Sequence, residues 1–134
     1  MTLSDLNLHL DMVTQLHAAR EILQNAQARI LGAQQFDDMP HAHEAARRTE
    51  NLSIFLDSRR REVERLEKIV ARSEISVRDF ISEITDPRTR AIFELRYLCG
   101  MSWDDVACMI GGGNTFDSVR MRVYRYLDST GDAQ

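Results

Sequence analysis

Cysteine, proline and aromatic residues are scarce in this chain. Its 134 residues include two cysteines and two prolines, and aromatic side chains make up 7% of the total. So few cysteines exclude a disulfide-built fold, and we expect Cys99 and Cys108 to be reduced, half-buried apolar residues. No apolar run reaches membrane length and no signal segment is recognised, so we expect a cytoplasmic protein with no membrane partner.

A basic excess is also lacking, because the formal net charge is −4 at pH 7. This balance argues against non-specific coating of nucleic acid, which normally requires a strongly basic chain. Any binding to a polyanion must therefore come from a local patch. The hydrophobic content of 43% is enough for a core, in one domain or in a domain with an appendage.

The first part of the chain has the pattern of an amphipathic helix from about Ser4 to Leu31, with Gly32 as its expected end. A loop from Gly32 to Met39 follows, and Pro40 favours a new helix start. The apolar stripe of the first helix comprises Leu6, Leu10, Val13, Leu16, Leu23, Ala26 and Ile30.

A second, much longer helix is predicted between Pro40 and Asp86, where neither glycine nor proline interrupts the chain. Nine charges of each sign between Glu44 and Glu83 make it a solvated surface and a poor DNA ligand. The helix either folds back on the first one as an antiparallel coiled-coil hairpin or pairs with a second subunit. It is expected to be continuous, and the alternative is a break near residues 73–76. Its heptad positions are Leu52, Leu56, Val63, Leu66, Val70, Val77, Phe80 and Ile84.

The segment after residue 85 predicts three short helices with well-marked ends. Asp86 can cap the first helix with Pro87 at its first position, and Gly100 supplies a left-handed stop. Ser102 can cap the second helix, and three consecutive glycines, 111–113, end it. Thr115 or Asn114 caps the third.

The third helix, residues 115–128, has one apolar face and one cationic face. Val119, Val123, Tyr126 and Leu127 fall on the inner face. Between Ser118 and Leu127 there are three arginines and no carboxylate. The residues turned outward or to the flanks are Ser118, Arg120, Met121, Arg122, Tyr124 and Arg125.

This arrangement is typical of a helix-turn-helix, in which the second helix enters the DNA major groove. The stretch from Leu95 to Leu127 resembles the helix-turn-helix of region 4 of bacterial sigma-70-type sigma factors. More narrowly, it is similar to small sigma-region-4-like proteins of prophages. The matching residues are Leu95, Arg96, Tyr97, Gly100, Asp105, Val106, Ala107, Ile110, Gly113, Thr115, Ser118, Val119, Arg120, Arg122, Arg125 and Leu127. Gly111 and Gly112 lengthen the turn by two residues relative to that pattern.

The resemblance implies a transcriptional regulator that binds double-stranded DNA. We expect an all-α fold in two regions. Residues 1–85 form a helical hairpin that dimerises or binds a partner such as RNA polymerase, and residues 86–134 form the DNA-binding module. Arg can bond the O6 and N7 atoms of guanine with two parallel donors. Base-edge contacts are expected from Ser118, Arg120 and Met121, and phosphate contacts from Asn114, Thr115, Arg122 and Arg125. Tyr124 is also expected among the DNA-binding residues.

Two other functions are compatible with the same sequence pattern. A phage DNA-packaging component of the small-terminase type also joins such a module to helical oligomerisation elements, and a protein-only module would dock on RNA polymerase without touching DNA. No catalytic constellation and no cofactor fingerprint is present, so we expect neither enzymatic activity nor a cofactor. His41, His43 and Glu44 lack a further ligand at useful spacing, so no metal site is expected.

Overall fold

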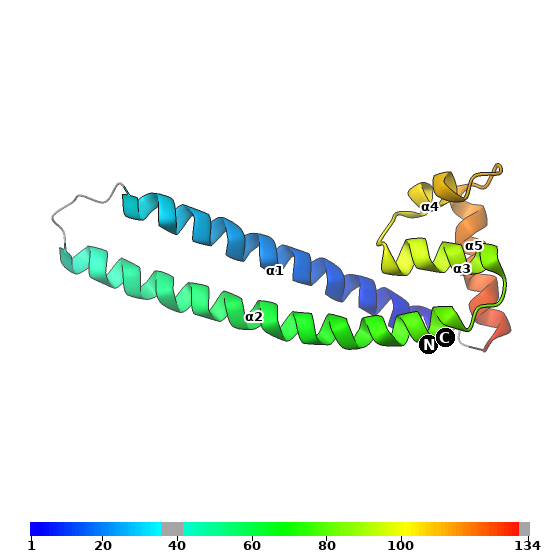
Figure 1. The fold of residues 1–134 in the computed structure, drawn as a ribbon, viewed down its shortest axis with the longest axis horizontal. Helices are drawn as coiled ribbons and strands as arrows, with labels where there is room; N and C mark the ends of the chain where they lie inside the picture. The colour runs from blue at the N-terminus through cyan, green and yellow to red at the C-terminus, as the bar shows by residue number, and fades with distance from the viewer. Residues whose placement is uncertain (36–41, 132–134) are drawn as a thin grey trace. The chain divides into compact units, whose positions relative to one another are not determined.

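The computed structural model describes residues 1–35 and 42–131, and the regular elements within those ranges are all helices (Figure 1). Two long helices, α1 (Leu3–Gln35) and α2 (Ala42–Ser82), form an antiparallel hairpin. Shorter elements follow: α3 (Pro87–Phe93), the π-helical turn η1 (Glu94–Leu98), α4 (Trp103–Ile110) and α5 (Phe116–Ser129). The predicted all-α class, a hairpin followed by three short helices, is confirmed.

The first long helix is longer than predicted at its C-terminal end, and the second is unbroken. The first helix passes through Gly32, where we expected it to stop, because one glycine costs a helix only about 1 kcal/mol relative to alanine. The second helix is continuous through Ser73 and Ser76, so the alternative of a break there is wrong. Both hydroxyls donate to carbonyl oxygens of the preceding turn, which accommodates them within the helix. The expected start at Pro40 and the side chain of His41 lie outside the described residues.

The chain forms two compact units, Val13–Ile69 and a second one that joins Met1–Met12 to Val70–Gln134. The second unit thus combines the chain's first helical turns with the short helices near its end. The sequence predicts one boundary, between residues 85 and 86, whereas the compact units are divided after residues 12 and 69. The predicted division into a partner region and a DNA-binding module concerns function, and it stays a prediction.

The unit Val13–Ile69 consists of helix segments with few fully buried side chains. Leu16, Val63 and Leu66 are its buried hydrophobic residues among those described. An ion pair between Arg20 and Glu67, 3.1 Å long and exposed, also joins α1 to α2. Such surface pairs add little stability, so the packing of these few apolar side chains holds this segment together.

The other unit has one continuous core to which every short helix contributes. Phe80, Phe93 and Tyr126 meet edge to face, with ring centroids 5.5 to 6.2 Å apart. Each fully buried large apolar side chain contributes about 1.5–3 kcal/mol. The buried members of the core are Leu6, Val77, Ile81, Ile84, Ile92, Phe93, Tyr97, Val106, Ala107, Val119, Val123 and Leu127.

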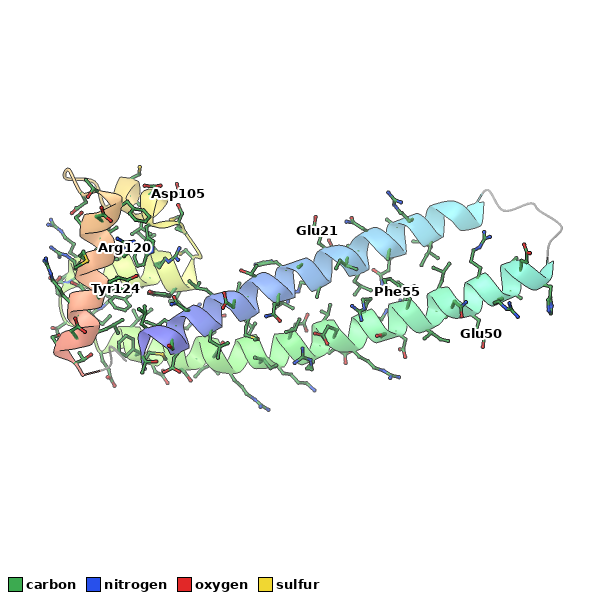
Figure 2. The ribbon with its side chains drawn as sticks, turned by 180° about the vertical axis from the view of Figure 1, so that it is seen from behind. Glu21, Glu50, Phe55, Asp105, Arg120 and Tyr124 are labelled. Carbon is green, nitrogen blue, oxygen red and sulfur yellow. The ribbon has the colours of Figure 1, made fainter. Side chains whose placement is uncertain are left out.

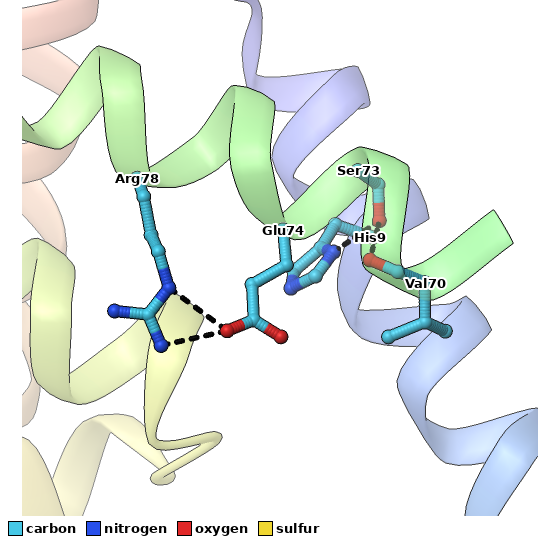
Figure 3. Close-up of polar contacts among 5 residues, drawn as sticks. All are labelled: His9, Val70, Ser73, Glu74 and Arg78. Atoms are coloured by element: carbon cyan, nitrogen blue, oxygen red, sulfur yellow. Dashed lines mark hydrogen bonds and ion pairs between the residues drawn. The ribbon is translucent and has the colours of Figure 1, made fainter. Parts of the chain in front are cut away.

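A polar contact accompanies this core where α1 packs against α2. His9 is 3% exposed, and its Nδ1 atom lies 2.6 Å from the hydroxyl oxygen of Ser73 (Figure 3). Burial lowers the pKa of His9, against the opposing effects of the Glu74 charge and of a hydrogen bond to the backbone of Tyr97. The carboxylate of Glu74 accepts hydrogen bonds from Arg78 at 2.6 and 2.8 Å. The fold therefore favours the neutral form of this histidine.

Candidate nucleic-acid interface

Two reciprocal hydrogen bonds fix the start of α5. The Thr115 hydroxyl accepts from the Ser118 amide at 3.2 Å, and the Ser118 hydroxyl accepts from the Thr115 amide at 2.8 Å. Serine here takes the position that glutamate or glutamine usually holds in a capping box. The predicted Thr115 cap is confirmed. Because the Ser118 hydroxyl is engaged in the cap, a base contact through it would compete with the helix start.

The three glycines before α5 adopt backbone conformations that other residues rarely take. Gly111, Gly112 and Gly113 have φ values of 67°, 65° and 77°. Gly111 ends α4, and its carbonyl accepts a hydrogen bond of 2.7 Å from the side-chain amide of Asn114. The turn is thus specified by glycine at each position, and Asn114 fastens it from the α5 side.

The outward face of α5 carries most of the predicted site. Val119, Val123 and Leu127 are buried on the opposite face, as the apolar periodicity predicted. Arg120 and Tyr124 lie along this helix, whereas Asp105 belongs to α4 (Figure 2). A shallow surface groove of about 630 Å³ runs along the outward face, lined by Asn114, Thr115, Asp117, Ser118, Met121, Arg122 and Arg125.

The cationic face of α5 was expected to have no acidic partner, but Arg120 has one. Its guanidinium donates to the Asp117 carboxylate at 2.8 Å and lies 4.9 Å from the centroid of the Phe116 ring. Its Nε atom is buried without a partner among the described atoms, and 35% of the side chain is exposed. Asp117 lies one position before the stretch in which no carboxylate was counted. The side chain expected to read bases is therefore folded back on its own helix.

Arg122 has a looser acidic neighbour from another element. Its Nη1 atom lies 3.6 Å from a carboxylate oxygen of Asp86, the cap of α3. That carboxylate already accepts hydrogen bonds from the hydroxyl and the amide of Thr89, at 2.6 and 3.0 Å. These bonds, and then the charge of Arg122, lower the pKa of Asp86. The cap chemistry predicted for Asp86 is confirmed, and the contact leaves Arg122 half-exposed on the groove.

Arg125 is the most accessible cation of the groove. It is exposed, and no carboxylate of the described residues lies within ion-pair distance of it. Met121, also exposed at 40%, offers an apolar surface beside it. Tyr124 is half-buried and packs against the core, so a flanking position suits it better than a central one.

Residue spacing could have predicted the contact between Arg120 and Asp117. Asp117 and Arg120 are three residues apart on one helix, a spacing that places side chains side by side, and Phe116 and Arg120 are four apart. Both contacts occur in the structure. The contact between Arg122 and Asp86 had no such local signal because the two residues belong to different elements.

The helix before the glycine turn is placed by its own cap and by aromatic packing. The Ser102 hydroxyl accepts a hydrogen bond from the Asp105 amide at 3.2 Å, as predicted. Trp103 packs edge to face on Tyr97, and the Arg96 guanidinium lies 4.7 Å from its ring centroid. Burial raises the pKa of Tyr97 to about 12.

The two cysteines correct a second expectation. Cys99 and Cys108 are free thiols and both are exposed, whereas we expected them to be half-buried. Cys99 follows the end of η1, and Cys108 lies on the outer face of α4 next to the exposed Met109. Their neighbours in sequence, Leu98 and Ala107, supply the apolar contacts with the core instead.

The described residues contain neither a metal-binding cluster nor a membrane-spanning helix. No group of three or more histidine, cysteine, aspartate or glutamate side chains in that part of the chain is placed to hold a metal ion. No helix there combines the length and apolar character needed to cross a bilayer.

No family model, curated protein or solved structure matches this chain.

Proposed function

We propose that this chain is a sequence-specific DNA-binding regulator of transcription, of the prophage type, that places α5 in the major groove. The observation that carries the proposal is the groove on α5, where Arg122 and Arg125 flank the exposed Met121 and no acid contacts Arg125 within the described residues. Arginine pairs bidentately with phosphate or guanine, and an apolar side chain can contact the methyl group of thymine.

This proposal keeps the phosphate contacts expected of Arg122 and Arg125, and it limits the base contact expected of Arg120. Arg125 binds phosphate directly, and Arg122 exchanges its long contact with Asp86 for a phosphate oxygen. Asn114 and Thr115 hold the turn and the helix start, so they position α5 and offer secondary phosphate contacts. Arg120 reaches a base only after it leaves Asp117.

A salt titration with single substitutions tests this proposal. Binding of a labelled random duplex is followed by fluorescence anisotropy over a range of salt concentrations, for the wild type and for Arg122→Gln and Arg125→Gln. Each substitution is expected to weaken binding and to lower the slope of log K against log salt by about one, because one fewer phosphate is neutralised.

Arg72→Gln is the matched control for this titration. It removes the same charge from an exposed position on α2, away from α5 in sequence. It is expected to leave the slope unchanged. An equal loss in all three variants, or a wild type that does not bind the duplex, would overturn the proposal.

A second candidate, docking on RNA polymerase without DNA contact, is supported by one exposed feature. Met109 on α4 is 62% exposed and lies beside Cys108, which makes an apolar spot outside the core. The same titration separates the two candidates, since a protein-only module has no counterions of DNA to release.

A further inference from the structure

The two helices of the unit Val13–Ile69 leave much of their apolar surface uncovered. Within residues 17–32 of α1 and 43–62 of α2, no described side chain is buried. Ile22, Leu31, Ile54 and Phe55 are 48%, 63%, 62% and 42% exposed. Of these, Ile54 and Phe55 are adjacent on α2 and together expose apolar surface of the kind found at interaction sites.

A groove marks the same stretch of α2. It has a volume of about 540 Å³, and its described lining comprises Glu44, Arg47, Arg48, Asn51, Leu52 and Phe55. Lining residues that are three or four positions apart lie on the same face of the helix. Phe55 and Glu50 are labelled on this helix in Figure 2, and only Phe55 belongs to the groove.

The charges along this face are arranged so that the helix complements itself. A seam at three- and four-residue spacing comprises Glu44, Arg47, Asn51, Ile54, Ser58, Glu62 and Arg65, and Phe55 flanks Ile54 at its centre. When a second copy of the seam runs in the opposite direction, Glu44 meets Arg65 and Arg47 meets Glu62. Asn51 then meets Ser58, and Ile54 meets Phe55 at the centre. Two-fold symmetry makes each of these contacts twice.

The described side chains are available for this pairing. Arg47 and Arg65 are exposed. Glu62 accepts hydrogen bonds from Arg65 of its own helix at 2.6 and 3.1 Å, and a carboxylate has acceptor positions left for a second guanidinium. A parallel arrangement in register would instead place each charge against its like.

We propose that a second copy of this chain docks antiparallel on this seam of α2 and forms a two-fold symmetric dimer. The exposed pair Ile54 and Phe55 lies at the symmetry axis, and two charge pairs on each side of it fix the register. This inference does not rest on DNA binding, because every residue of the seam lies outside α5.

Charge-swap variants test the dimer in the absence of DNA. Sedimentation equilibrium of the full chain is expected to give twice the chain mass of 15.4 kDa for the wild type. Arg47→Glu and Glu62→Arg each set like charges against each other twice, and each is expected to raise the dissociation constant at least tenfold. The double variant restores opposite charges in reversed order and is expected to regain the wild-type mass.

Arg60→Glu and Glu64→Arg are the matched controls, since the same charge changes fall on the opposite face of α2 by helical spacing. They are expected to keep the dimer. Helix content from circular dichroism shows whether each variant folds, and Ile54→Ser is a second disruptive variant that changes no charge. A monomer at every concentration, a ring of many copies, or a double variant that stays dissociated would overturn the proposal.

Discussion

Arg120 and Arg125 lie on the same helix, yet their electrostatic surroundings differ. Arg120 is half-buried, bound to Asp117 and stacked on Phe116. Arg125 is exposed, with no acidic partner among the described residues. A guanidinium that already has a carboxylate must give it up before it binds a phosphate, so on the proposed function we expect Arg125 to contribute more to DNA affinity than Arg120.

Removal of the acid that holds Arg120 is expected to strengthen DNA binding. Asp117→Asn keeps the size of the side chain and removes its charge. We expect a several-fold gain in affinity for random duplex and a salt slope steeper by about one. A random duplex offers Arg120 no specific base to read, so the freed guanidinium neutralises a phosphate instead. Fluorescence anisotropy measures both quantities.

The control for this prediction is Asp128→Asn in the last turn of α5, where no described arginine contacts the carboxylate. It removes the same charge and is expected to change the affinity much less. If both variants gain equally, general repulsion of DNA explains the effect and the specific role of Asp117 is wrong.

At the scale of the elements, the starts of the short helices followed from the sequence because cap chemistry is local. Asp86, Ser102 and Thr115 each accept a hydrogen bond from an amide three residues on, as their types and positions predicted. Gly32 was wrong as a helix end because propensity is a weak preference within a long helix.

Contacts between elements were beyond the reach of sequence patterns. The approach of Arg122 to Asp86 and that of His9 to Ser73 depend on how distant segments pack. The periodic pattern placed the apolar faces of α5 correctly, but it could not show which outward arginine keeps an acidic neighbour.

The packing of α1 against α2 at His9 predicts a stability that depends on pH. Its pKa is lowered in the fold, so the unfolded chain binds the proton more readily. The stabilising contribution is therefore complete above the ordinary value of about 6.5 and is lost as the pH falls below it. We expect the free energy of unfolding to fall from pH 7.5 to 5.5, with a slope for this group of at most about 1.4 kcal/mol per pH unit.

Urea denaturation at several pH values measures this slope. His9→Gln is expected to be less stable at neutral pH and to lose the part of the slope that belongs to this residue. His17→Gln, which changes an exposed histidine of the same helix, serves as the control. Equal pH dependence in the wild type and the His9 variant would refute the assignment.

At the scale of the whole molecule, the net charge of −4 sets the conditions for binding. On the proposed function, the net charge supplies no long-range attraction to DNA, so we expect the affinity to depend on the few arginines of α5 and to fall with salt in proportion to their number. A dimer through α2 would present two copies of α5 and raise the effective concentration of the second contact. If the chain binds DNA as proposed, its acidic balance favours specific over indiscriminate binding.

The most direct test of the central claim is an NMR titration with DNA. A duplex is first selected from a random pool, and amide shifts of the isotope-labelled full chain are followed as that duplex is added. We predict that the largest shifts fall at residues 114–125 and that Arg125→Gln weakens the titration. Shifts confined to α4 or to the long helices, or no shifts at all, would contradict the assignment of α5 as the DNA-reading helix.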